Sequence, residues 1–63
     1  MHNYTKFEKL LNERSVTTYQ VAKATGIPRS TFTGWKNGAY QPKVDKLQKI
    51  AKFFNVSVTY FLE

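Results

Sequence analysis

Two short segments with helical periodicity meet at Gly26 with almost no chain between them. The first begins near Thr17 and places Val21 and Ala22 inward, and the second begins at Pro28. Glycine tolerates the left-handed backbone that ends a helix, and proline is favoured in the first turn of the next one. Helices joined this tightly must cross steeply, at about 90–120°. A small side chain is needed where the two backbones approach, and Ala22 meets that need.

Helical periodicity continues on both sides of this junction, and an alternating strand pattern is absent except at Val56–Val58. We expect a first helix over about residues 3–14, a fourth that Pro42 begins and Asn55 ends, and a short last helix capped by Ser57. The architecture predicted is therefore all-α, a compact domain of five helices. The inward stripes predict a core of Tyr4, Phe7, Leu10, Leu11, Val21, Ala22, Ile27, Phe32, Trp35, Val44, Leu47, Ile50, Ala51, Phe54 and Phe61.

The ends of the two central helices are marked in the sequence. Thr17-Thr18-Tyr19-Gln20 has the form of a capping box, in which the Thr17 hydroxyl and the Gln20 amide each satisfy a free backbone N–H. Asn37-Gly38 is a stop signal for the helix that follows Pro28. Both central helices are therefore expected to be short.

Composition excludes several classes of function. With 63 residues, the chain forms one domain over 1–63 and is too small to enclose a deep substrate cavity. It has no cysteine, one histidine near the N-terminus (His2) and no glycine-rich phosphate loop. Glu8 and Glu13 are five residues apart and do not share a helix face well. No catalytic role, metal or cofactor is therefore expected. No apolar run approaches the roughly 18 residues of a membrane span, and the N-terminus does not resemble a signal peptide, so we expect a cytoplasmic protein with no membrane partner.

The positive charge is concentrated in the middle of the chain. The formal net charge is +6. No acidic residue lies between Arg14 and Val44, but the basic residues Lys23, Arg29 and Lys36 lie in that stretch. This unneutralised stretch predicts a surface for a polyanion. A second basic series recurs every third residue at Lys43, Lys46, Lys49 and Lys52, and we interpret it as a solvated helix face.

Two short helices that cross at a glycine turn form a helix-turn-helix, whose second helix can enter the major groove of DNA. Residues 17–36, followed by Asn37-Gly38, resemble the lambda-repressor/Cro-like family, also called the XRE family. Residues 42–62 resemble the fourth and fifth helices of that family and include its Leu-x-x-Ile-Ala-x-x-Phe-x-Val-Ser pattern. The resemblance covers residues 5–62. It implies a five-helix domain that binds double-stranded DNA, usually as a homodimer on a near-palindromic operator.

The resemblance also implies which side chains contact base edges. They are Arg29 and Ser30 at the start of the third helix, with Thr31 beside them, and Thr33 and Gly34 one turn later. A guanidinium can donate two bonds to guanine, which makes Arg29 the strongest candidate; a phosphate contact is the alternative. The family often has a longer polar residue at the Gly34 position. Either Gly34 lets the backbone approach the DNA, or that operator position is not contacted.

Contacts to phosphate are expected around the third helix. The family pattern implies them for Thr18, Asn37, Tyr40 and Gln41, and the charge distribution adds Lys36 and Lys43, for which plain solvation is the alternative. Thr18 stands where the family often has glutamine, which contacts both phosphate and the base-reading side chains. Thr18 is too short to do both.

Two aromatic residues lie off the predicted core stripes near the C-terminus. Phe53 and Tyr60 could form an exposed apolar patch and a dimer interface, and the alternative is packing against the first helix. The other off-stripe rings are scattered, unlike the grouped aromatics of proteins that bind single strands.

The predicted function is that of a transcriptional regulator of a bacterium or phage, a repressor that binds a palindromic operator as a dimer at the nucleoid. The chain is either complete or the N-terminal part of a longer regulator. Two alternatives remain open. The same fold serves in antitoxins and as a surface bound by regulatory proteins, and a sequence-neutral nucleic-acid binder would have a similar charge.

Overall fold

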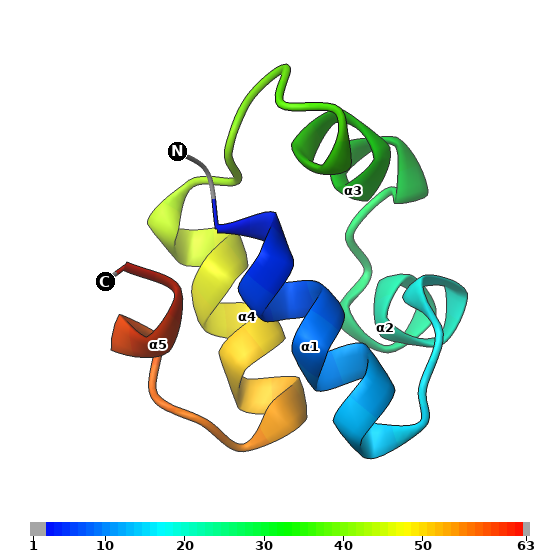
Figure 1. The fold of residues 1–63 in the computed structure, drawn as a ribbon, viewed down its shortest axis with the longest axis vertical. Helices are drawn as coiled ribbons and strands as arrows, with labels where there is room; N and C mark the ends of the chain where they lie inside the picture. The colour runs from blue at the N-terminus through cyan, green and yellow to red at the C-terminus, as the bar shows by residue number, and fades with distance from the viewer. Residues whose placement is uncertain (1–2, 63) are drawn as a thin grey trace.

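The computed structural model describes residues 3–62, so His2 and Glu63 lie outside the described residues. Those residues form five α-helices and no strand (Figure 1), which confirms the all-α, five-helix prediction. The helices are α1 (Tyr4–Arg14), α2 (Thr18–Thr25), α3 (Arg29–Lys36), α4 (Val44–Phe54) and α5 (Thr59–Leu62).

Helices α2 and α3 lie on one side of the molecule and α5 on the other, with α1 and α4 between them (Figure 1). Helix α2 packs on both α3 and α4, and α5 packs on α1. The Arg14 guanidinium donates a hydrogen bond of 2.8 Å to the carbonyl of Phe54 and so joins the ends of α1 and α4. At the other end of α1, the Asn3 side chain donates to the carbonyl of Phe61. These bonds tie α1 to α4 and to α5.

The helix ends of the central pair follow the sequence closely. The Thr17 hydroxyl accepts from the Gln20 backbone N–H at 3.2 Å, and the Gln20 side-chain oxygen accepts from the Thr17 N–H at 2.8 Å, so the capping box is confirmed. Gly26 ends α2 with φ +78°, the left-handed conformation expected of it. Asn37 follows the last residue of α3, and Asn55 ends α4 with φ 58°.

Both prolines lie slightly outside the helices that they were expected to begin. Pro28 is the residue before α3, with ψ 142°, and the helix starts at Arg29. Pro42 is buried in the connecting loop, Lys43 has ψ 165°, and α4 starts at Val44. The fixed φ of proline suits a helix, but the extended ψ at Pro28 and Lys43 shows that the chain is still turning there. At α5, the Ser57 hydroxyl accepts from the Thr59 N–H at 3.3 Å, as expected of a cap.

The predicted core is confirmed with a few exceptions. Val44 was expected inside but is 49% exposed, because side chains tilt toward the N-terminus of a helix and Val44, at the first position of α4, extends past the core. Tyr4 and Leu11 are only partly buried at its edge. The buried hydrophobic side chains are Phe7, Leu10, Val21, Ala22, Ile27, Phe32, Trp35, Leu47, Ile50, Ala51, Phe54 and Phe61.

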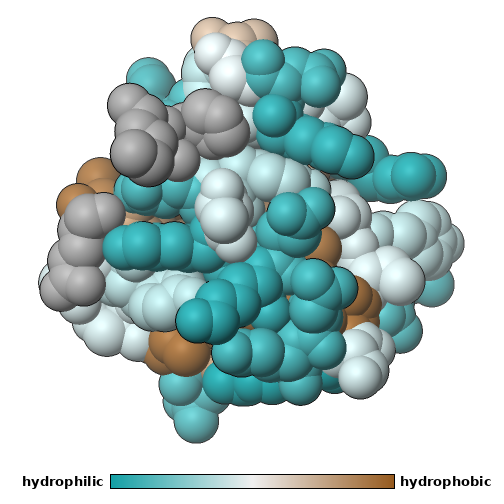
Figure 2. All heavy atoms as spheres, in the orientation of Figure 1, coloured by the Kyte–Doolittle hydropathy of each residue, from teal (hydrophilic) through white to brown (hydrophobic). Residues whose placement is uncertain are grey.

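Aromatic rings dominate this core. The Phe7 ring stacks on Phe32 at a centroid distance of 5.1 Å and lies 5.3 Å from Trp35. Trp35 in turn contacts Tyr4 at 5.6 Å and Phe61 at 6.1 Å, so α1, α3 and α5 meet through their rings. The Trp35 indole N–H has no hydrogen-bond acceptor among the described residues. The face seen in Figure 2 is mostly hydrophilic, with apolar atoms in small separate areas.

Candidate nucleic-acid interface

Helix α3 has one buried face and two exposed rows of residues. Phe32 and Trp35 point into the core. Beside this face, one row contains Arg29, Thr33 and Lys36, at the spacing of successive helical turns, and all three are exposed. The second row contains Ser30, which is exposed, and Gly34, which is half-buried. The second row contacts the loop after α3, and Arg29 of the first row contacts α2.

Arg29, the strongest candidate for a base contact, is held by an aromatic ring from α2. Its guanidinium carbon lies 5.6 Å from the centroid of the Tyr19 ring, a cation–π arrangement. Tyr19 is 54% exposed, and it is the second residue of α2, whose start is fixed by the capping box. Thr18 was expected to be too short to contact both phosphate and the base-contacting side chains, and the ring at the next position supports Arg29.

Four of the predicted contact residues line one surface pocket between the start of α2 and α3. They are Thr18, Arg29, Thr33 and Lys36, and the lining is completed by Tyr4 and Phe32. The pocket combines two cationic groups and the N-terminal end of α2, which suit a phosphate oxygen. The Thr33 hydroxyl in its lining donates to the carbonyl of Arg29 at 3.3 Å.

Tyr4 is a member of this pocket that the sequence prediction missed. Burial and the nearby Glu8 carboxylate raise the pKa of the Tyr4 phenol, while a hydrogen bond with the Thr18 side chain lowers it; the net shift is upward. The phenol is therefore neutral at neutral pH and can act as a hydrogen-bond partner at the start of α2. Its inward helical spacing predicted only a core position.

The second row of α3 is covered by Tyr40, from the loop between α3 and α4. The Tyr40 hydroxyl donates a hydrogen bond of 3.2 Å to the carbonyl of Ser30. A Cβ atom built on Gly34 would lie 2.6–2.7 Å from the outer atoms of the Tyr40 ring. Gly34 is thus the position on which the Tyr40 ring packs.

The remaining loop candidates gather on this side of α3. Thr31, Tyr40, Gln41 and Lys43 line a second pocket, together with Pro42, Asp45 and Lys46. Asp45 places one acid there, next to two lysines. Asn37 lines neither pocket and is exposed after the end of α3, where its backbone N–H donates to the carbonyl of Thr33 at 3.0 Å.

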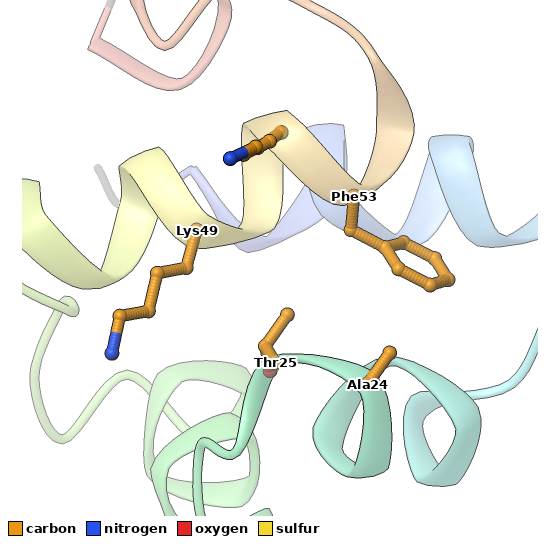
Figure 3. Close-up of a pocket in the computed structure, with 5 residues that line it drawn as sticks. Ala24, Thr25, Lys49 and Phe53 are labelled. Carbon is orange, nitrogen blue, oxygen red and sulfur yellow. The ribbon is translucent and has the colours of Figure 1, made fainter.

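The two residues predicted for a dimer interface are engaged with different elements. Phe53 is 38% exposed and lines a pocket between α4 and the end of α2, with Ala24, Thr25, Lys49 and Lys52. Figure 3 shows Lys49 and Phe53 extending from α4 on the side where Ala24 and Thr25 of α2 lie. Tyr60 is half-buried on α1: the Lys6 ammonium lies 5.6 Å from its ring centroid, and its hydroxyl donates to the Lys6 carbonyl at 3.5 Å. None of the helices within residues 3–62 is long and apolar enough to cross a membrane.

Comparisons with known proteins agree with this geometry. A model of the Cro/C1-type HTH DNA-binding domain matches residues 6–63. The chain is 30% identical over 54 residues to the cryptic phage CTXphi transcriptional repressor RstR of Vibrio cholerae. The matched region covers 86% of this chain and 49% of RstR. It is 32% identical over 57 residues to the uncharacterized HTH-type transcriptional regulator YobD of Bacillus subtilis, covering 90% of this chain and 51% of YobD.

A third relative is closer to this chain in length. An uncharacterized HTH-type transcriptional regulator of Methanocaldococcus jannaschii is 34% identical over 58 residues, or 92% of this chain and 85% of that protein. The chain thus spans about half the length of the first two relatives. No solved structure gives a significant match. The chain belongs to the Cro/C1-type helix-turn-helix family of DNA-binding transcriptional regulators.

Proposed function

We propose that this chain is a repressor domain that binds a specific duplex operator through α3, with Arg29 as the main base-contacting residue. The observation that carries the proposal is the exposed row of Arg29, Thr33 and Lys36 around one pocket with Thr18 at the start of α2. The Tyr19 ring limits the directions in which the Arg29 guanidinium can point. A guanidinium held in this way can donate two parallel hydrogen bonds to guanine.

Phosphate contacts lie on either side of this row in the proposal. Thr18 and Lys36 bind one stretch of backbone, and Asn37, Gln41 and Lys43 bind the strand across the groove. Thr31 and Ser30 supply weaker base contacts beside Arg29. The role is one of binding and steric exclusion at a promoter, without catalysis, metal or cofactor, and it is carried out at the nucleoid in a bacterial or phage-infected cell.

A pair of domains on a palindromic operator completes the proposal. A single α3 of eight residues spans few base pairs, so specificity requires two half-sites about one helical turn apart. Phe53 is the candidate contact between copies because it is the exposed aromatic residue on α4. Lys49 and Lys52 line the same pocket as Phe53 and repel a second copy, so we expect pairing on DNA and a monomer without it.

The alternative of a surface for a regulatory protein is less well supported. It would be favoured by an apolar patch that joins Phe53 and Tyr60, but Tyr60 is half-buried against Lys6 of α1. Phe53 alone, which shares its pocket with Lys49 and Lys52, offers little apolar area.

Selection from random duplex DNA tests the proposal directly. We expect enrichment of a motif with two related half-sites, with binding that weakens steeply as salt increases because counterions are released. Sedimentation with and without the selected duplex would then measure the stoichiometry. Equal binding to selected and random duplexes would instead support the sequence-neutral alternative, and a motif without symmetry would contradict the dimer.

A further inference from the structure

Gly34 has no side chain and so leaves a space in the second row of α3, and the Tyr40 ring occupies that space. The outer ring atoms, Cζ, Cε2 and the hydroxyl oxygen, lie where a side chain at position 34 would begin, 2.6–2.7 Å from an ideal Cβ. The ring is nevertheless 51% exposed. The exposed surface at the second turn of α3 is therefore formed by the ring of Tyr40, a loop residue, and not by a side chain at position 34.

The hydrogen bonding of Tyr40 limits what this surface can bind. Its hydroxyl donates its proton to the carbonyl of Ser30 at 3.2 Å. A phenol has one proton, so the group that a phosphate oxygen would need is already used. The free surface consists of ring carbons and the lone pairs of the hydroxyl oxygen.

The surrounding residues give this surface an orientation. Ser30 lies one turn before Gly34, in the row beside Arg29; the ring packs on Gly34, and its hydroxyl is bonded to the Ser30 carbonyl. Thr31 and Tyr40 line the same pocket, so the ring also lies near Thr31, another candidate base contact. The apolar group that the major groove offers to such a surface is the 5-methyl group of thymine.

We propose that Tyr40, rather than residue 34, makes the base contact at the second turn of α3, with its ring packed against the methyl group of one thymine in each half-site. This inference rests on the proposed function, because it assumes that α3 lies in the major groove. Tyr40 then acts as a specificity-determining residue and not as a phosphate contact. Gly34, which has no side chain, leaves the space that the ring occupies.

Three variants separate these roles. Tyr40→Ala removes the ring. Tyr40→Phe keeps the ring over Gly34 and removes only the hydroxyl. Gly34→Ala places a methyl group in the space of the ring, which must swing away, while the helix itself favours alanine over glycine. Circular dichroism and thermal melting would show that each variant is folded.

The test replaces each thymine of the selected operator in turn by uracil, which removes only the 5-methyl group. For the unsubstituted protein, we expect one position per half-site at which uracil weakens binding about fourfold, the effect of one buried methyl group. Tyr40→Phe should retain that dependence. Tyr40→Ala and Gly34→Ala should both lose it, and the double variant should lose no more than either single one.

The outcomes distinguish this inference from the function on which it rests. If the unsubstituted protein selects no motif, the proposed function fails, and the thymine contact fails with it. If a motif is selected but uracil has no effect at any position, or has the same effect in Tyr40→Ala, the thymine contact alone is wrong. If Tyr40→Phe binds every duplex more weakly and the uracil effect does not depend on Tyr40, the hydroxyl contacts phosphate and the inference is overturned.

Discussion

Helices α3 and α4 both bury one face and expose cationic residues on the other, but their exposed faces are built differently. On α3, the Arg29 guanidinium rests on the Tyr19 ring, and Tyr40 is hydrogen-bonded across the next row. On α4, Lys49 and Lys52 are exposed, and neither has a hydrogen bond, ion pair or ring contact within residues 3–62. A ring from α2 holds Arg29 of α3 in place, whereas Lys49 and Lys52 of α4 are free to move in solvent.

This difference shows that the density of positive charge does not locate the site. The series of Lys43, just before α4, and Lys46, Lys49 and Lys52 within it is at least as dense as the charge near α3. A mobile ammonium adds a screened and unspecific attraction to a polyanion. A guanidinium held over a ring has lost much of its conformational freedom before binding, so it can discriminate between bases at a lower entropic cost. The following predictions test whether the two helices differ in this way.

The largest effect is expected from Arg29→Ala. Loss of a bidentate contact should reduce discrimination at one base pair by about 1–3 kcal/mol. The measurement is a titration against operators that carry each of the four bases at every position. Lys49→Ala is the matched control and should leave the base preference intact; a loss of preference in both variants, or in neither, would remove the distinction between α3 and α4.

The next effect concerns the starts of α2 and α4. Thr17→Ala removes the side-chain half of the capping box and should lower the free energy of unfolding by about 1 kcal/mol. For a domain of this size, that corresponds to a decrease in Tm of about 4–8 °C in a thermal melt. Lys43→Ala should not lower Tm, because Lys43 makes no side-chain cap bond at α4. A lower Tm for Lys43→Ala would show that the α4 lysines do have a structural role.

A further effect should distinguish Lys43 from the rest of its series. Lys43 lines the pocket beside Tyr40 and Gln41, close to α3, and we expect it to bind phosphate. Lys43→Ala should weaken all duplexes about equally and reduce the slope of log K against log salt by about 1. Lys52→Ala, farther along α4, should change the slope less, and equal slopes for the two variants would contradict the assignment.

The smallest effect is expected from removing the support of Arg29. Tyr19→Leu keeps apolar bulk but loses the ring, and should weaken operator binding by about 0.5–1 kcal/mol. Tyr19→Phe keeps the ring face and should bind as the unsubstituted protein does. If Tyr19→Phe loses as much as Tyr19→Leu, the phenol hydroxyl rather than the ring is what matters.

Local signals predicted most of the fold. The capping box at Thr17 and the glycine end at Gly26 depend on residues within a few positions of each other, and both occur as expected. The aromatic core was also predictable, because helical periodicity fixes which side chains share a face. Val44 was misassigned because periodicity does not reveal where a helix extends past the body that it covers.

The organisation of the candidate site was less predictable. The residue types and positions along α3 could be named from the sequence, but not what holds them. The contact between Tyr19 and Arg29 depends on the crossing of α2 and α3, and the contact between Tyr40 and Gly34 depends on the path of a loop. Neither spacing has a period that a sequence pattern expresses, so the sequence predicts no role for Tyr19 and only a phosphate contact for Tyr40.

The single tryptophan of the chain gives this domain an intrinsic fluorescent reporter. The Trp35 indole is fully buried among rings of α1 and α5, on the buried face of α3. Unfolding should shift its emission to longer wavelength as the indole meets water. Addition of DNA to the opposite face should leave the emission maximum unchanged, so one signal reports folding without interference from binding.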